Sequence, residues 1–217
     1  FILDLNEKKE VRKIISSYRM QDFEDLNLLT PGISWNPDGT KLAISAKAGG
    51  NDAIFIVDAK DGNYEKLDIK MNSLTSVAWS RNGEYLSFVA TVLEKSDIYL
   101  YNLNSKKLSN LTEDLFSDSN PVWGPNPDLI YFISDRGDNL DKERRTTSQK
   151  MWKYDVSQTD IYSINIKTLE IKRITKNSEF FKSSLAISSD GTKILYVLDD
   201  YGIGNIYELH FTTNKVY

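Results

Sequence analysis

The sequence predicts an all-β protein, a β-propeller built of four-stranded antiparallel blades. Two separate signals recur along the chain and carry this prediction. The first is a strand, a tight turn and a second strand, whose copies are anchored at Trp35, Trp79, Trp123 and Ile187. The second is a short apolar strand, whose copies begin at Ile54, Ile98, Ile161 and Ile206. Self-similarity of this kind, at about 40–45 residues, is typical of propeller blades.

The first complete unit shows how the four strands arise. Residues 32–35 form one predicted strand, and Asn36-Pro37-Asp38-Gly39 a turn in which proline fixes φ and Gly39 accepts a positive φ. Strands are predicted at 41–46 and 53–58, and the fourth at 64–69 after a turn at 60–63. A single sheet of this kind covers neither of its faces, so neighbouring units are expected to stack face to face. The three tryptophans are expected to lie between blades.

The phase of the repeat predicts about four and a half blades in one domain, residues 1–217. Two short strands, at 1–4 and 11–15, form a half blade within residues 1–18. Four whole blades follow, at approximately 31–69, 73–115, 116–178 and 180–217. Because such an arc leaves sheet edges and one blade face bare, we expect the segment to be part of a six- or seven-bladed ring.

Composition narrows the classes of partner. The chain has 217 residues, 27 Lys and Arg against 31 Asp and Glu, and a net charge of -4. Nucleic acid is not expected as a partner, since it would favour a basic face. No apolar run approaches the roughly 18 residues that a membrane span needs. The absence of cysteine excludes disulfides, and the opening Phe1 leaves the question of a targeting segment open.

The repeat resembles the WD-like propeller repeats of the TolB family. The likeness rests on four elements: residues 35–42, Ser134-Asp135-Arg136-Gly137, the Asp-Ile-Tyr triplets at 97–99 and 160–162, and the Leu/Ile-Thr pairs at 111–112 and 174–175. It covers roughly residues 31–217. The resemblance implies a propeller fold and an extracytoplasmic, periplasmic setting in a bacterium. The same repeat also occurs in peptidase propellers.

A binding surface is predicted where the longest connections emerge. About 20 extra residues, 137–159, separate the second and third strands of the third unit, and a connector spans residues 18–30. Both belong to the face that carries second-to-third strand loops and blade-to-blade connections. Long loops in a compact domain are often functional. Aromatic residues and arginine are favoured at interface centres, so the candidate contact residues are Arg144, Arg145, Trp152, Tyr154 and Phe23.

Catalytic and metal chemistry find little support in the sequence. There is no cysteine and no Gly-x-Ser-x-Gly turn, and the single histidine, His210, ends a predicted strand. No His or Cys cluster suggests zinc. The spacing of Asp135, Asp138 and Asp141 does not match a calcium loop, and no pair of acids is singled out for glycoside hydrolysis. No catalytic residue, cofactor or metal is therefore predicted.

The favoured function is a non-catalytic scaffold that binds a protein or peptide. The alternative is the gating propeller of a prolyl-oligopeptidase-type serine peptidase, whose hydrolase domain would lie outside this segment. A weaker alternative is a carbohydrate-binding or glycosidic propeller. The sequence leaves the oligomeric state open.

Overall fold

The structure, a computed structural model, describes residues 1–3, 11–15, 24–26, 32–92, 95–141, 158–176, 180–200 and 202–211. Within these ranges every regular element is a β-strand, and the strands form successive antiparallel sheets. This confirms the all-β fold class predicted from the repeats.

Four of the sheets follow one another as blades I to IV. Blade I contains β4 (Ile33–Trp35), β5 (Lys41–Ala48), β6 (Asn51–Asp58) and β7 (Tyr64–Lys66). Blade II contains β8 (Ser73–Trp79), β9 (Tyr85–Val92), β10 (Lys95–Asn102) and β11 (Leu108–Asn110). Blade III contains β12 (Asp118–Trp123), β13 (Leu129–Ser134), β14 (Asp160–Asn165) and β15 (Ile171–Arg173), and the described part of blade IV contains β16 (Phe181–Ile187), β17 (Lys193–Asp200) and β18 (Ile203–His210). Before them come β1 (Ile2–Leu3), which pairs with β2 (Val11–Arg12), and β3 (Asp25–Leu26).

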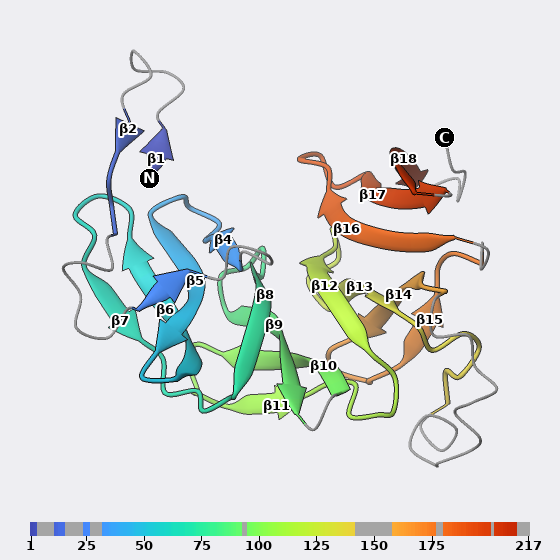
Figure 1. The fold of residues 1–217 in the computed structure, drawn as a ribbon, viewed down its shortest axis with the longest axis horizontal. Coiled ribbons are helices and arrows are strands. Elements are labelled where there is room, and N and C mark those ends of the chain that lie inside the picture. The colour runs from blue at the N-terminus through green and yellow to red at the C-terminus, as the bar shows by residue number, and fades with distance from the viewer. Residues whose placement is uncertain are drawn as a thin grey trace.

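The blades fan out around a common centre, as Figure 1 shows. The first strands β4, β8, β12 and β16 lie innermost, and each later strand lies farther out. The arc stays open between blade IV and the end of blade I that carries β1 and β2. An open arc agrees with a partial propeller.

In blades I, II and IV the tight turn that joins the first two strands has the geometry expected from the sequence. In blade I the Gly39 amide donates to the Asn36 carbonyl at 3.1 Å, with Gly39 at φ 71°. Gly83 and Gly191 repeat this bond to Ser80 and Ser188 at φ 78° and 71°. A positive φ is inexpensive only for glycine, which explains the residue at this place.

A β-bulge recurs in the innermost strands. The pairing of β8, β12 and β16 shifts register at the same place in each strand. The residue at that place has a positive φ: 54° at Ser76, 50° at Asn120 and 56° at Ser184. A bulge of this kind bends and twists a strand.

Blade I differs from the other blades in its pairing, because β3 and β4 both pair with β5. The connector predicted at 18–30 therefore contains two strand residues.

The core consists of a separate apolar cluster at each junction between neighbours. Ala43 and Ile54 of blade I share a cluster with Leu86 and Phe88 of blade II. Three further clusters join blade II to III, blade III to IV, and blade I to the segment around β1 and β2. Since alternate residues of a strand point to opposite faces, the central strands of blades I, II and III each contribute to two clusters.

The tryptophans pack between blades only where a complete neighbour is present. Trp123 is 5% exposed and its indole Nε1 donates to the Ala78 carbonyl of blade II at 3.2 Å. Trp79 is half-buried beside blade I. The prediction fails at Trp35, which is 46% exposed, because β1 and β2 alone do not cover this face of blade I.

The far end of the arc shows the same effect. Ile54, Ile98 and Ile161 are fully buried, and each faces the following blade. Their counterpart in blade IV, Ile206, is 75% exposed. Both ends of the arc therefore expose apolar positions that the internal junctions bury, which supports the prediction of a larger ring.

Candidate functional site

The antiparallel blades divide the chain's connections between two faces. The connector face carries the hairpins that join second to third strands, and the connections from one blade to the next. The turn face carries the other hairpins. The described ends of the long connection between β13 and β14, residues 137–141 and 158–159, belong to the connector face.

Several aspartates and asparagines on the turn face accept hydrogen bonds within their own turns. Asp38 Oδ1 accepts the Thr40 amide at 2.9 Å, and Asp190 Oδ1 accepts the Thr192 amide at 3.0 Å. Asn102 and Asn165 cap the later hairpins of blades II and III in the same manner. The hydrogen bond from the Ser188 hydroxyl, with those from Thr192, lowers the pKa of Asp190 to about 2. These carboxylates and amides have a structural role in closing the turns.

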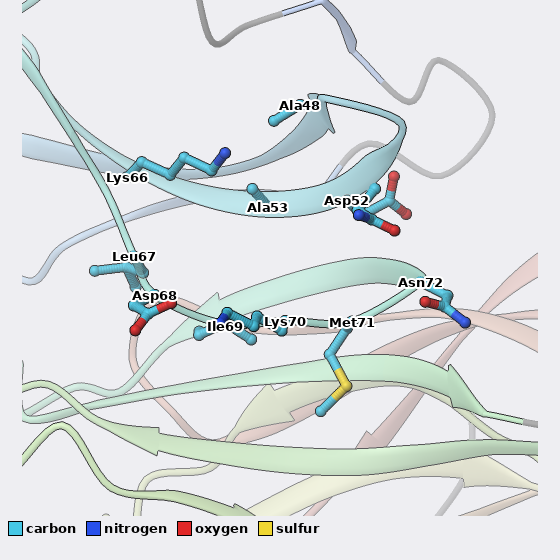
Figure 2. A pocket seen from close by; sticks show the side chains of 11 residues that line it. Ala48, Asp52, Ala53, Lys66, Leu67, Asp68, Ile69, Lys70, Met71 and Asn72 are labelled. Atoms are coloured by element: carbon cyan, nitrogen blue, oxygen red, sulfur yellow. The ribbon is translucent and has the colours of Figure 1, made fainter.

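The connector face has a pocket of about 420 Å³ between blades I and II (Figure 2). One wall is the hairpin of β5 and β6, with Ala48, Asp52 and Ala53; the other is the connection 66–72 into blade II. Both carboxylate oxygens of Asp52 have partners: Oδ2 accepts a hydrogen bond from the Leu74 backbone amide at 2.7 Å, and Lys47 Nζ lies 2.6 Å from Oδ1. The pocket is open and mixed in polarity.

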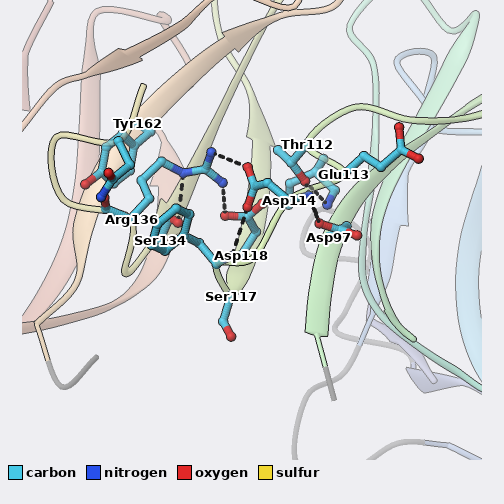
Figure 3. A network of polar contacts seen from close by, with 12 residues as sticks. Asp97, Thr112, Glu113, Asp114, Ser117, Asp118, Ser134, Arg136 and Tyr162 are labelled. Carbon is cyan, nitrogen blue, oxygen red and sulfur yellow. Dashed lines mark hydrogen bonds and ion pairs between the residues drawn. The ribbon is translucent and has the colours of Figure 1, made fainter. Parts of the chain in front are cut away.

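A buried charged cluster lies between blades II and III (Figure 3). The Arg136 side chain, fully buried, donates from Nη1 to Asp114 Oδ2 at 2.8 Å and from Nη2 to Asp118 Oδ1 at 2.5 Å. The rings of Phe132 and Tyr162 lie 5.2 and 5.7 Å from its guanidinium carbon. Burial raises the pKa of both aspartates, an effect that Arg136 opposes.

The same junction holds a third buried acid, Asp97. Its Oδ1 accepts the Thr112 hydroxyl at 3.2 Å, and its Oδ2 accepts a hydrogen bond from the side-chain Nδ2 of Asn110 at 2.9 Å. Thr112 Oγ1 in turn accepts the Ile98 amide at 3.0 Å. One carboxylate oxygen each of Asp97, Asp114 and Asp118 lies within 4.8 Å of the other two.

The junction between blades III and IV repeats this design with other charges. Thr175 Oγ1 accepts the Ile161 amide at 3.0 Å and donates to Asp160 Oδ1 at 2.7 Å. Arg173 pairs with Asp160, and Lys182, fully buried, lies 2.9 Å from Asp160 Oδ1. Two cations therefore hold one buried acid.

These two junctions anchor both roots of the connection 137–159. At the first root the Tyr162 hydroxyl donates to the Gly137 carbonyl at 2.8 Å, and Asn139 Nδ2 donates to the Arg136 carbonyl at 2.7 Å. At the second root, Lys182 Nζ donates to the Thr159 carbonyl at 2.9 Å. Both described ends of the long connection are therefore hydrogen-bonded to buried residues.

The five candidate contact residues, Arg144, Arg145, Trp152, Tyr154 and Phe23, lie outside the described residues, so their proposed role stays a prediction.

Other side chains considered from the sequence have local partners. Asp138 pairs with Arg173 at 2.8 Å, and Asp135 accepts the Ser117 amide at 2.9 Å. His210 Nε2 lies 2.9 Å from Glu208.

Sequence reasoning missed the cluster of Asp97, Asp114 and Asp118. The acids weighed as calcium ligands, Asp135, Asp138 and Asp141, are close in sequence, whereas the three acids of the cluster come from β10, the connection after β11, and β12. One signal was present: Asp97 and Asp160 each directly precede the isoleucine of the repeated third strand, and each is followed 15 residues later by a threonine.

No family model matches the chain. Among solved structures, TolB proteins match it, including TolB from Acinetobacter baumannii at a TM-score of 0.66 and 22% identity, over 85% of this chain and 42% of that one. The fold is a TolB-like β-propeller. The chain spans less than two thirds of the length of the TolB chains it matches.

The TolB-like propeller is also similar to enzymes. An oligogalacturonate lyase in complex with manganese matches at a TM-score of 0.61 and 15% identity, over 85% of this chain and 51% of that one. A puromycin-hydrolysing peptidase from Mycobacterium tuberculosis matches at 0.63 and 14% identity, over 85% and 30%. At these identities the likeness concerns the fold alone. Across the described ranges, no helix is long and apolar enough to cross a membrane.

Proposed function

We propose that this TolB-like propeller is a non-catalytic scaffold that binds a protein or peptide on its connector face, in the cell envelope of a bacterium. The observation that carries the proposal is the anchoring of both roots of the connection 137–159 to buried groups. A loop that starts and ends on a rigid scaffold can hold contact residues with little loss of order on binding.

The contrast between the two faces supports this choice. On the turn face, Asp38, Asp190, Asn102 and Asn165 are engaged in closing turns. The connector face combines the long connection with the pocket between blades I and II. The sequence of the long connection contains Arg144, Arg145, Trp152 and Tyr154, and these residue types favour interface centres.

The test is peptide selection followed by affinity measurement. The 217-residue chain is immobilised and panned against a random peptide library, and enriched peptides are measured by calorimetry. The double variant Arg144→Ala, Arg145→Ala should bind at least about tenfold more weakly, a loss of about 1.4 kcal/mol, with an unchanged melting temperature. The matched control is Lys106→Ala, Lys107→Ala, which removes two basic residues from an exposed hairpin on the turn face and should keep full affinity. Equal losses in both variants, or no enriched peptide, would contradict the proposal.

A second candidate is a gating propeller in front of a serine peptidase domain. The similarity to the puromycin-hydrolysing peptidase favours it, because that chain is more than three times as long as the part matched here. Sequencing the gene beyond this segment separates the two functions: a downstream domain with a Gly-x-Ser-x-Gly turn would support the gate.

A further inference from the structure

We propose that Asp97, Asp114 and Asp118, at the junction of blades II and III, bind a divalent cation that prefers oxygen ligands, with Ca²⁺ as the best fit. The site is independent of the peptide-binding proposal and involves none of its contact residues.

The spacing of the carboxylates fits such an ion. Two oxygens that share one Ca²⁺ at about 2.4 Å are at most about 4.8 Å apart. One oxygen from each of the three aspartates meets this limit with respect to the other two. The three side chains come from different elements, and each residue is less than 9% exposed, so the site is built into the junction and does not depend on a surface loop.

An unsatisfied atom points independently to a ligand. Asp118 is 1% exposed, and Arg136 takes its Oδ1. Its Oδ2 is buried and has no hydrogen-bond partner among the described residues. A buried carboxylate oxygen without a partner is costly. An ion bound by Oδ2 would remove this cost while leaving the Arg136 contact in place.

The junction between blades III and IV has a cationic side chain at a place where the junction between blades II and III has an acid. Lys182 pairs across with Leu198, four residues after Ile194. Asp118 pairs across with Ser134, four residues after Ile130. Lys182 and Asp118 therefore occupy the same place in their blades.

A second cationic side chain of the junction between blades III and IV, Arg173, is also replaced at the junction between blades II and III. Arg173 and Asn110 occupy one place, opposite Tyr162 and Tyr99. Where Asp160 meets two cationic side chains, Asp97 meets an amide and another acid. When the three aspartates are ionised, Arg136 offsets one of the three negative charges, and two remain. A divalent cation supplies that charge.

The donor set selects the class of ion. All the side-chain donors are oxygens, which Ca²⁺, Mg²⁺ and Mn²⁺ prefer, and no histidine or cysteine is among them. A carboxylate has about four lone-pair sites, so Asp97 and Asp114 can keep their present hydrogen bonds and still bind the ion.

The experiment measures binding of the ion alone. The 217-residue chain is dialysed against a chelator, transferred to chelator-free buffer and titrated with CaCl₂ and, separately, MnCl₂ by calorimetry, with melting temperatures in parallel. We expect one ion per chain and a higher melting temperature with at least one of the two salts. Asp118→Asn, which keeps the shape of the side chain, should weaken binding at least about tenfold. Glu113→Gln is the matched control, since this exposed side chain points away from the cluster (Figure 3) and should leave binding unchanged.

A further variant keeps the proposal testable if Asp118→Asn does not fold. Asp118→Lys copies the residue at the same place in blade IV, and should fold and melt at one temperature with or without the salts. If the wild type gives neither heat nor a shift in melting temperature with about 5 mM of either salt, the proposal is wrong. A wild-type response that persists in Asp118→Asn or Asp118→Lys would equally overturn it.

Discussion

The junction of blades II and III and the junction of blades III and IV share one backbone design but balance their charges differently. Both contain an aspartate and a threonine that bridge the third and fourth strands, at Asp97 and Thr112 and at Asp160 and Thr175. At the second junction the neighbouring places hold Arg173 and Lys182, which neutralise Asp160. At the first junction, among the residues that the structure describes, the buried acids outnumber the buried cation Arg136.

The difference shows what a propeller repeat fixes. Main-chain pairing and the apolar cluster are repeated from blade to blade, because each blade must bury both faces. The polar edge of each junction is free to vary, provided that every buried charge has a partner. The specific properties of this chain are therefore expected at its polar junctions.

The largest expected effect is the loss of Arg136. Arg136→Met should lower the free energy of unfolding by about 5 kcal/mol, the upper end for removing one partner of a buried ion pair, because it leaves Asp114 and Asp118 without their shared cation. Denaturant unfolding of the 217-residue chain measures it. Arg81→Met, on the turn face, is the control and should change stability by less than about 0.5 kcal/mol. A loss below about 1 kcal/mol for Arg136→Met would show that the acids do not depend on the guanidinium.

The second-largest expected effect concerns Trp123, in the apolar part of the junction between blades II and III. Trp123→Ala should cost about 4 kcal/mol, as truncation of a buried tryptophan does, since Trp123 is 5% exposed. Trp35→Ala, at the same place in blade I but 46% exposed, should cost less than about 1 kcal/mol. Thermal and denaturant unfolding of the two variants measures the difference. Equal losses would mean that the open end of the arc is covered in solution.

Loss of the buried lysine should be milder than loss of the buried arginine. Lys182→Met should cost about 3 kcal/mol, the lower end of the range for a broken buried pair, because Arg173 still neutralises Asp160. Unfolding in denaturant again measures it, and Lys172→Met, an exposed lysine beside Glu170, should have almost no effect. If Lys182→Met costs more than Arg136→Met, Arg173 does not compensate for the loss of the lysine at the junction of blades III and IV.

Much of the fold could be predicted because the same local sequence patterns recur several times along the chain. The turn at Asn36 to Gly39 and the strand at Ile54 each specify local geometry, and their repetition specified the blades. Exposure at the ends could not be read in the same way. Trp35 has the same local pattern as Trp123, and its burial depends on a neighbour that local sequence does not encode.

The candidate site was less predictable for a physical reason. Asp97, Asp114 and Asp118 are brought together by the stacking of two blades, and no spacing along the chain reveals which acids face one another across a junction. The repeat itself offered a partial guide, since alignment of the copies places Asp118 against Lys182 and Asn110 against Arg173.

The smallest expected effect concerns an exposed acid of the turn face and separates it from the buried acids of the junctions. The pKa of Asp190 is lowered to about 2 by hydrogen bonds from Ser188 and Thr192, against about 3.9 in an unfolded chain. A group whose pKa falls on folding stabilises the fold above its unfolded pKa, and that contribution is lost as the pH drops from about 4 to about 2. The stability difference between wild type and Asp190→Asn should therefore be present at pH 7 and shrink on acidification, measured by unfolding at a series of pH values. A difference that stays constant down to pH 2, or a carboxyl midpoint near 4 by NMR titration, would show that this turn does not hold its aspartate as the geometry implies.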